Sequence, residues 1–298
     1  MLPGMKRFFI AGSLSPTNVR LREALRDYDL EVALLPVEGV ARRAQPGDVV
    51  LARLDVRPTL DGIADGLGQL DQLERSGVRV LNRPATLFAT HDKLTTAIRL
   101  HEALLPHPAT SLVADDPRHH VEAPVVVKPR FGSWGRDVYR CRDQRALRRT
   151  LRRLRNRPWF RQQGALVQAL VPPRGEDLRV IVAAGRVVGA IKRVAAPGEW
   201  RTNVALGARR VPVEPPLGAC ALALAAADAV GADFVGVDLL PSSEGYVILE
   251  LNGCVDVTDA YSLDDTSVFD AIASRLIAAA DAALHPSEGF GVPTLVTQ

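Results

Sequence analysis

Two carboxylates and one amide in a predicted β-hairpin have the residue types of a hard-metal site. Asp238 lies in FVGVDLL and Glu250 in YVILELN, and both are equidistant from Glu244 in the intervening turn. Simple strand pairing therefore places the carboxylates opposite each other, and Asn252 shares the face of Glu250. Such an all-oxygen site suits Mg²⁺ when phosphates complete its shell. The alternative is that both carboxylates lie on the solvent-exposed face of the hairpin.

A glycine loop beside a lysine adds a predicted phosphate site. In VVVKPRFGSWGRDV, a stiff strand presents Lys128, and Gly132, Ser133, Trp134 and Gly135 follow. Exposed N–H groups of such a loop and a nearby ammonium both favour packed negative charge. The pattern alone is a weak signal for a polyphosphate.

The rarity of lysine strengthens this interpretation. Of the 37 cationic residues, only Lys6, Lys93, Lys128 and Lys192 are lysine. A compact ammonium and a guanidinium fork interact differently with a phosphate, so the three internal lysines call for a common explanation.

A second predicted hairpin supplies further cations. Arg179, Lys192 and Arg193 flank VIVAAGRVVGAI, and EWRTNVALG follows with Arg201 and Asn203. Strand alternation places Asp177 and Arg179 on one face and points Lys192 and Arg193 to opposite sides. Cations near a metal-bound polyphosphate would stabilise the charge that develops during its transfer.

The elements that position these residues form an α/β protein with several units. Strands and helices alternate from Phe8 to Asn82, which predicts a small unit with a parallel sheet. Helical spacing continues from Asp92 to Pro106, with Thr90 as a candidate cap. We expect an N-terminal α/β domain at 1–85, a central subdomain with the glycine loop at 86–165, a C-terminal subdomain with the metal site at 166–285, and a tail at 286–298.

Composition and charge narrow the function classes. The 298 residues are 47% hydrophobic and 24% charged, as in ordinary globular proteins. The first residues contain too short an apolar run for a signal peptide, and aspartates interrupt the most apolar long stretch. Three cysteines without metal-ligand spacing predict neither a disulfide framework nor a zinc site. We therefore expect a cytoplasmic protein without membrane contact.

An arginine-rich segment has two interpretations. Nine arginines and one acidic residue lie between Arg142 and Arg161. The segment is either a solvated helix face in an arginine-rich chain or a docking face for nucleic acid or an acidic protein. A formal net charge of only +3 and the absence of a nucleic-acid motif argue against nucleic acid.

Seven motifs follow one another along the chain: HDKLTT, VVVKPRFGSWGRDV, LVQALV, EDLRVIV, AIKRVAAPGEWRTN, GVDLL and ILELN. Taken in this order, they resemble the motifs of the ATP-grasp ligases, and most closely those of the RimK and LysX branch. The resemblance covers roughly residues 80–252, and the first unit resembles the N-terminal domain of the family more loosely. Many motifs in one order are far more specific than any one alone.

The resemblance implies an ATP-grasp fold that holds ATP between two α+β subdomains. It implies an acylphosphate made from a carboxylate, which an amine converts into an amide. Positioning and charge neutralisation then account for catalysis. The implied nucleotide contacts are Lys93, Lys128, Gly132, Ser133, Trp134, Gly135, Gln168, Ala169, Leu170, Val171 and Asp177. The implied catalytic residues are Arg179, Lys192, Arg193, Arg201 and Asn203, and the implied Mg²⁺ ligands are Asp238, Glu250 and Asn252.

The sequence departs from the family pattern at three places. Ala169 replaces a common glutamate in the adenine hinge, Leu206 to Ala208 replace an RGG turn, and GCVDVTDAYSLDD follows Asn252. All three lie where nucleotide or substrate would be selected. Cys254 has no histidine near it in the sequence, and we interpret it as a passive thiol.

We therefore predict an ATP- and Mg²⁺-dependent ligase, with Mn²⁺ as an alternative metal. It would join an amine, expected to be an amino acid, to the carboxylate of a small molecule, a peptide or an acidic carrier protein. One rival is an ATP-grasp kinase that makes a stable phosphoester, and the other is a non-catalytic nucleotide-binding or nucleic-acid module. The identity of the acid and the amine, the number of successive additions and homo-oligomer formation are left open.

Overall fold

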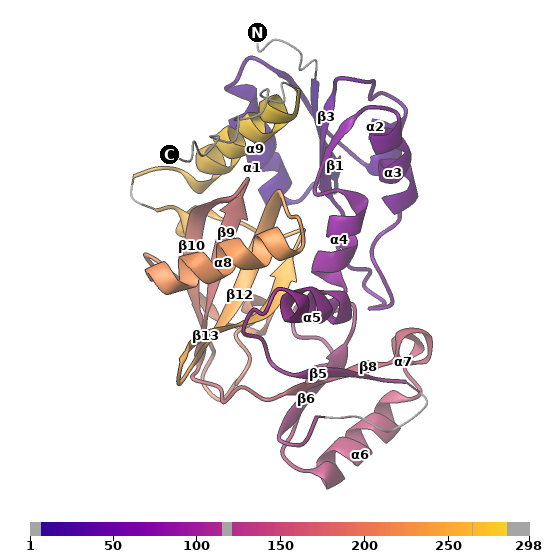
Figure 1. The fold of residues 1–298 in the computed structure, drawn as a ribbon, viewed down its shortest axis with the longest axis vertical. Helices are drawn as coiled ribbons and strands as arrows, with labels where there is room; N and C mark the ends of the chain where they lie inside the picture. The colour runs from indigo at the N-terminus through magenta and orange to yellow at the C-terminus, as the bar shows by residue number, and fades with distance from the viewer. Residues whose placement is uncertain (1–6, 115–120, 264, 285–298) are drawn as a thin grey trace, which may run out of the picture.

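The computed structural model describes residues 7–114, 121–263 and 265–284, so the expected tail at 286–298 lies outside the described residues. Three sheets succeed one another along the chain. Figure 1 shows the first sheet at the top, the third below it and the second at the bottom, with helices against their faces.

The first sheet is parallel and has the strand order β2-β1-β3-β4. Ser15 caps its first helix by accepting a hydrogen bond from the N–H of Asn18, and Pro16 follows at the first helical position. The elements are β1 (Arg7–Gly12), α1 (Pro16–Arg26), β2 (Glu31–Leu35), α2 (Val37–Ala41), β3 (Val49–Arg53), α3 (Leu67–Arg75) and β4 (Arg79–Leu81).

Two helices lead to the second sheet, which is antiparallel with the order β5-β8-β6-β7. On α6 the leucines 147, 151 and 154 are spaced by one helical turn and pack beneath the helix, while its arginines face solvent. The elements are α4 (Pro84–His91), α5 (Lys93–Glu102), β5 (Thr110–Val113), β6 (Val125–Pro129), β7 (Tyr139–Cys141), α6 (Gln144–Leu154), α7 (Pro158–Gln163) and β8 (Ala165–Ala169).

The third sheet is also antiparallel, in the order β11-β10-β9-β12-β13. Its elements are β9 (Glu176–Ala183), β10 (Arg186–Val194), a 3-10 turn η1 (Val204–Leu206), β11 (Arg209–Pro212), α8 (Leu217–Ala229), β12 (Phe234–Ser242), β13 (Gly245–Asn252), a 3-10 turn η2 (Asp259–Tyr261) and α9 (Val268–Leu284).

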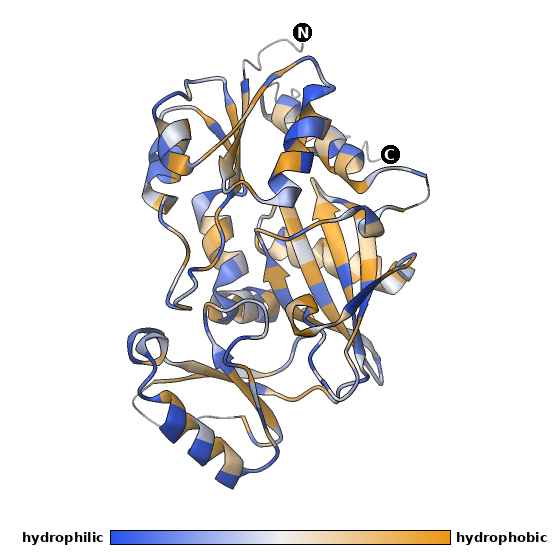
Figure 2. Ribbon diagram, turned by 180° about the vertical axis from the view of Figure 1, so that it is seen from behind, coloured by the Kyte–Doolittle hydropathy of each residue, from blue (hydrophilic) through white to orange (hydrophobic). Residues whose placement is uncertain are grey.

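Apolar side chains cover both faces of this third sheet, but polar side chains interrupt one of them. Val180, Val182 and Val237 pack against the alanine-rich helix α8. On the opposite face Ile181 and Ile191 join α9 and the first sheet in a shared core. In Figure 2 the strands are largely orange, with blue segments interrupting them. The charged residues Arg179, Arg193 and Asp238 lie on these strands.

One sequence expectation needs correction. Asp92, and not Thr90, caps α5: its side chain accepts from the N–H of Leu94, whereas Thr90 lies inside α4 and donates to the carbonyls of Thr86 and Leu87. The second sheet extends to Ala169, because β8 pairs with β5 and β6. Among the described residues no helix combines the length and the apolar character needed to span a bilayer.

Candidate active site

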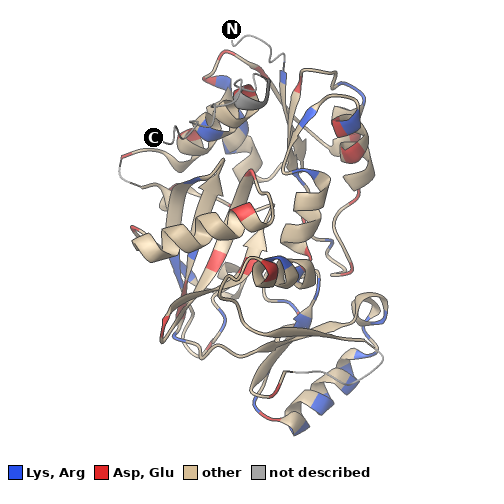
Figure 3. Ribbon diagram, in the orientation of Figure 1, with Lys and Arg blue, Asp and Glu red and all other residues tan. Residues whose placement is uncertain are grey.

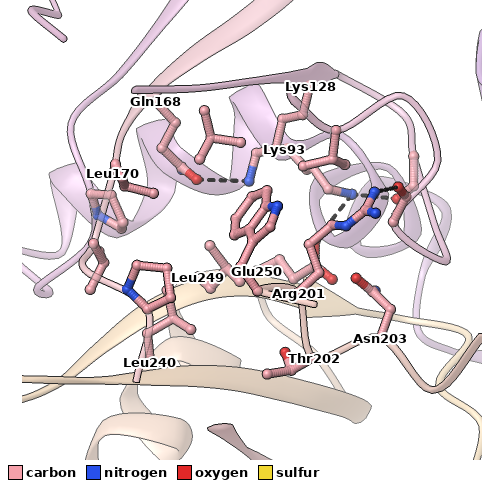
Figure 4. A pocket seen from close by; sticks show the side chains of 18 of the residues that line it. Lys93, Lys128, Gln168, Leu170, Arg201, Thr202, Asn203, Leu240, Leu249 and Glu250 are labelled. Carbon is pink, nitrogen blue, oxygen red and sulfur yellow. Dashed lines mark hydrogen bonds and ion pairs between the residues drawn. The ribbon is translucent and has the colours of Figure 1, made fainter. Parts of the chain in front are cut away.

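A cleft lies between the second and third sheets. Figure 4 shows Lys93, Lys128 and Gln168 on one side of it and Leu240, Leu249 and Glu250 on the other. Apolar and cationic side chains thus meet in one elongated space, as a nucleotide with an aromatic base and a charged tail requires.

Lys93 is held at the first turn of α5. The guanidinium of Arg130 donates two hydrogen bonds, of 2.9 and 2.5 Å, to the carboxylate of the capping residue Asp92. The backbone carbonyl of Arg130 accepts a hydrogen bond from the N–H of Lys93. The Lys93 ammonium then donates to the carbonyl of Gly132 at 2.5 Å and lies 3.3 Å from Glu250. The glycine loop, α5 and β13 are therefore joined at one ammonium.

Lys128 reaches the same cleft from the central strand β6. Its ammonium donates to Oε1 of Gln168 on β8 at 2.8 Å, and the side chain is buried. Burial lowers the pKa of Lys128 to about 8; nearby Glu250 opposes this shift and nearby Lys93 adds to it. An anionic ligand would favour the charged form of this lysine.

The glycine loop folds over the cleft and touches the segment after β10. Trp134 and Gly135 both have positive φ, at 56° and 70°. A Cβ at Gly135 would lie 2.7 Å from Oδ1 of Asn203, so only glycine permits this approach. Arg201 donates to the carbonyl of Gly135 at 2.9 Å and is itself paired with Glu199. This contact links the loop to the third sheet.

The apolar part of the cleft comes from β8 and from a bulge in β13. Gln168 to Val171 line it from above. Below, the register between β12 and β13 shifts after Asp238, which leaves Leu249 unpaired, and Leu249 and Glu250 both line the cleft. The sequence predicted that Asp238 and Glu250 pair because they are equidistant from Glu244, and the two residues do pair. The turn itself pairs Ser242 with Gly245, and the bulge then shifts the register by one residue, which brings Glu250 opposite Asp238.

The three predicted metal ligands lie on neighbouring strands but differ in access. Glu250 lines the cleft and also a second cavity, which Asn252 lines as well. Asp238 is fully buried: Arg179 contacts both of its oxygens at 2.6 and 2.7 Å, and Arg193 contacts one at 2.8 Å. Although burial alone would raise it, these two guanidinium groups hold the pKa of Asp238 well below its usual range.

Besides Asp238, two predicted residues line neither the cleft nor the second cavity. Asp177 is buried beneath it, where it accepts hydrogen bonds from Arg193 and from Thr202, so its contact with the site is indirect. Lys192 is opposite Leu178 on the other face of the sheet and pairs with Glu176 at 3.1 Å. Strand alternation allows only one of Lys192 and Arg193 to face the site, and it is Arg193 that does so.

A second cavity adjoins the cleft beside Ser133 and Glu250. It shares Ser133, Trp134, Arg193, Asn203 and Glu250 with the cleft, and its own lining includes Asp55, Asp256 and Arg210. The sequence analysis missed these last three. Asp55 follows a strand of the first sheet and belongs to no local motif. Arg210 lies four residues after Leu206, which occupies the position of the arginine in the RGG turn of the family pattern.

Cys254 also lines this second cavity. Burial raises the pKa of its thiol to about 11, with nearby Arg53 opposing the shift. A protonated thiol is a poor nucleophile, so the passive interpretation of Cys254 is consistent with its surroundings.

The donor set suits a hard divalent cation in part. Glu250 and Asn252 supply oxygen ligands on the cavity wall, and Nδ2 of Asn252 is buried without a hydrogen-bond partner. Asp238 would have to exchange a guanidinium for the metal. Among the described residues no three His, Cys, Asp or Glu side chains cluster as a metal-binding group, so phosphate oxygens would complete the shell.

Comparison with known proteins identifies relatives of this chain. The RimK-like ATP-grasp domain matches residues 84–278. A coenzyme γ-F420-2:α-L-glutamate ligase of Methanocaldococcus jannaschii is 31% identical over 61% of this chain and 65% of its own length. A glutamate–LysW ligase ArgX of Sulfurisphaera tokodaii is 29% identical over 72% of this chain and 78% of its own. The structure of the ATP-grasp ligase PsnB with a minimal precursor, Mg and ADP superimposes with a TM-score of 0.65 at 20% identity, covering 92% of this chain and 98% of that one.

Proposed function

The chain belongs to the RimK-like ATP-grasp family of ATP-dependent carboxylate–amine ligases, and we propose that it activates a carboxylate as an acylphosphate and joins it to an amino acid. The observation that supports this most directly is the shared position of Glu250, which borders both the nucleotide cleft and the second cavity. The phosphate end of ATP and the reacting acid would meet at that side chain.

We assign the nucleotide to the cleft between the sheets. The adenine would lie against Leu170, Leu240 and Leu249, and the phosphates would lie beside Lys93 and Lys128. Backbone N–H groups of the glycine loop and two ammonium groups favour a polyphosphate there. Ala169 removes a side-chain contact, so the backbone of β8 and its extension carries the recognition of the base.

Mg²⁺ held by Glu250, Asn252 and the nucleotide would neutralise phosphate charge, and Mn²⁺ could use the same oxygen ligands. The protein's own contribution is fixed charge. Arg193 and Arg201 line the cleft, and each is already oriented by a carboxylate, Asp177 and Glu199 respectively. Preoriented cations stabilise the transferring phosphoryl group without reorganising during the reaction.

The proposed reaction has two steps and needs no side-chain nucleophile. A carboxylate oxygen of the acid attacks the γ-phosphorus, the bond to the bridging oxygen breaks, and ADP leaves. The amine nitrogen then attacks the acylphosphate carbonyl and the carbon–oxygen bond to phosphate breaks. The entering ammonium loses two protons in all: one leaves with hydrogen phosphate and one reaches solvent.

The outer face of α6 supports an acidic protein as the carrier of the reacting carboxylate. Arg148, Arg149, Arg152 and Arg153 are exposed, and Figure 3 shows the cationic stripe along this helix. No described carboxylate pairs with any of them. The ArgX relative is named for joining glutamate to LysW, which makes glutamate the first amine to test.

Reversing these four arginines to glutamate tests the carrier. We expect KM for an acidic protein substrate to rise at least tenfold, because electrostatic attraction is lost, while a small-molecule acid is used unchanged. Reversal of the exposed Arg26, Arg42, Arg43 and Arg186 is the matched control. Unchanged kinetics with a protein acid, or salt-sensitive binding to nucleic acid instead, would remove this part of the proposal.

A screen of ADP release against pairs of carboxylates and amines, followed by mass spectrometry, tests the activity itself. We expect ADP, phosphate and an amide in equal amounts for the accepted pair. A stable phosphoester would identify a kinase. The absence of turnover with every pair, despite nucleotide binding, would identify a non-catalytic module.

A further inference from the structure

Four groups of the second sheet and its entry loop form a chain of hydrogen bonds that ends at Lys128. The hydroxyl of Thr110 donates to the carbonyl of Pro108 at 2.8 Å and accepts from Nε2 of Gln168 at 2.9 Å. Oε1 of Gln168 in turn accepts from the ammonium of Lys128 at 2.8 Å. Pro108, Gln168 and Lys128 line the cleft, whereas Thr110 does not. The hydroxyl of Thr110 therefore acts on the cleft through its neighbours.

The register of the sheet brings these side chains together. Thr110 on β5 pairs with Gln168 on β8, which pairs with Val126 on β6. Lys128 is two residues from Val126, so strand alternation places it on the same face. Val127, on the alternate face, packs in the core beneath α6. Figure 4 shows the hydrogen bond between Gln168 and Lys128 as a dashed line.

The direction of every hydrogen bond in this chain is fixed from its two ends. The carbonyl of Pro108 can only accept, and the ammonium of Lys128 can only donate. The hydroxyl of Thr110 therefore turns its hydrogen to Pro108 and its lone pairs to the NH₂ group of Gln168. This leaves the amide oxygen for Lys128. The reverse orientation of the amide would set its NH₂ group against the ammonium.

Burial makes the orientation of this amide important. The side chains of Gln168 and Lys128 belong to residues that are only 6% and 5% exposed. A buried donor that loses its acceptor is destabilised, because water does not replace the lost partner. The ammonium has three N–H groups, and Gln168 accepts from one of them. Two are then left for the phosphate oxygens of the proposed nucleotide.

We propose that Thr110 is a positioning residue for Lys128: its hydroxyl orients the amide of Gln168, whose oxygen holds the ammonium in place for the phosphates of the nucleotide. The inference rests on the proposed function and adds to it a residue that lies outside the cleft. Thr110 touches neither the nucleotide nor the reacting atoms in this account, so it is not a catalytic residue.

Calorimetric titration with AMPPNP in the presence of Mg²⁺ tests the effect on binding. Thr110→Val replaces the hydroxyl with a methyl group of similar size, and we expect Kd for AMPPNP to rise about fivefold, as for the loss of one net hydrogen bond. Thr110→Ser keeps the hydroxyl and should keep Kd within about twofold of the wild-type value. Ser111→Ala, which removes a hydroxyl from the other face of β5, is the matched control and should do the same.

A second background separates amide orientation from packing. The carboxylate in Gln168→Glu has two equivalent oxygens, so it presents an oxygen to Lys128 without help from residue 110. In this background Thr110→Val should change Kd for AMPPNP by no more than about twofold. A full loss of affinity in this background as well would show that the hydroxyl acts through packing, and would overturn the proposal.

The pKa of Lys128 gives a readout that needs no nucleotide. Burial lowers this pKa to about 8, and the charges of Glu250, Lys93 and Asp238 also act on it. These influences stay the same in Thr110→Val, but the amide oxygen that favours the charged ammonium is no longer held in place. We therefore expect the pKa to fall by a further half unit, roughly. NMR titration of ¹³C-labelled lysine measures it, and Lys128→Met assigns the signal among the four lysines.

The outcomes distinguish this inference from the proposed function. If Thr110→Val changes neither Kd for AMPPNP nor the pKa of Lys128, the inference is wrong and the ligase proposal stands. If the pKa falls but Kd does not change, the hydroxyl orients the amide without serving the nucleotide, and the inference is again wrong. If both change as expected but no pair of carboxylate and amine yields an amide, the role of Thr110 stands and the ligase proposal falls.

Discussion

The nucleotide cleft and the second cavity share a wall but differ in their balance of charge. Six cations and only two carboxylates, Glu176 and Glu250, line the cleft. Three arginines and three carboxylates, Asp55, Glu250 and Asp256, line the second cavity. An excess of cations favours a polyanion, whereas a lining of both signs can contact ligand groups of either charge. The first arrangement suits the proposed nucleotide, and the second does not select for a polyanion.

Replacing the side chain common to both regions should have the largest effect. Glu250→Ala removes a proposed oxygen ligand of Mg²⁺, and we expect kcat to fall by about 10³-fold, as for loss of one strong transition-state contact. Steady-state ADP release measures this. Glu244→Ala, in the exposed turn of the same hairpin, is the matched control. Activity that survives in Glu250→Ala would remove the metal assignment.

A lysine inside the cleft and one outside it sharpen the contrast. Lys128→Met removes a buried ammonium beside the phosphates, so kcat/KM for ATP should fall by about 10²-fold. Lys192→Met should leave kcat/KM within twofold, because Lys192 lies on the other face of the sheet. Equal losses in the two variants would contradict the placement of the nucleotide.

The closure of the glycine loop can be weakened without removing charge. Gly135→Ala introduces a Cβ 2.7 Å from Asn203, and we expect KM for ATP to rise about tenfold. Gly198 has a similar positive φ, +80°, but a Cβ there would meet nothing within 4 Å. Gly198→Ala is therefore the control that introduces backbone strain without a steric contact. Similar KM values in the two variants would show that loop contact is unimportant.

Nucleotide affinity should depend on pH through Lys128. Its pKa of about 8 in the free protein rises when phosphates bind, so binding takes up a proton above pH 8 and weakens as pH rises. Between pH 7.5 and 9 the affinity for AMPPNP should fall about eightfold, if the bound lysine stays charged. Calorimetry in buffers of different ionisation enthalpy measures the proton uptake. Uptake that persists in Lys128→Met would assign it to another group.

The same comparison explains how far the sequence could predict the site. The cleft is built from short continuous segments, such as the glycine loop and β8, whose residue types and spacing can be read locally. The hairpin pairing of Asp238 with Glu250 was also predictable, although the bulge at Leu249 that produces it was not. The sequence around Asp238 does not reveal that arginines from two other strands, Arg179 and Arg193, donate hydrogen bonds to its carboxylate.

Most of the lining of the second cavity could not be predicted from local sequence patterns. Asp55 and Asp256 lie 201 positions apart, and the contact between their segments depends on the packing of the first sheet against the loop after β13. Sequence alternation limited Lys192 and Arg193 to opposite faces but could not say which one faces the site. Tertiary packing decides both questions.

Trapping the activated acid with hydroxylamine tests the central claim most directly. The protein would be incubated with MgATP, hydroxylamine and a panel of carboxylates, and hydroxamate and ADP would be measured together. We predict one hydroxamate per ADP for the accepted acid, because hydroxylamine intercepts an acylphosphate without an amino-acid site. ADP release that depends on an acid but never yields hydroxamate, or a phosphoester product, would contradict the account.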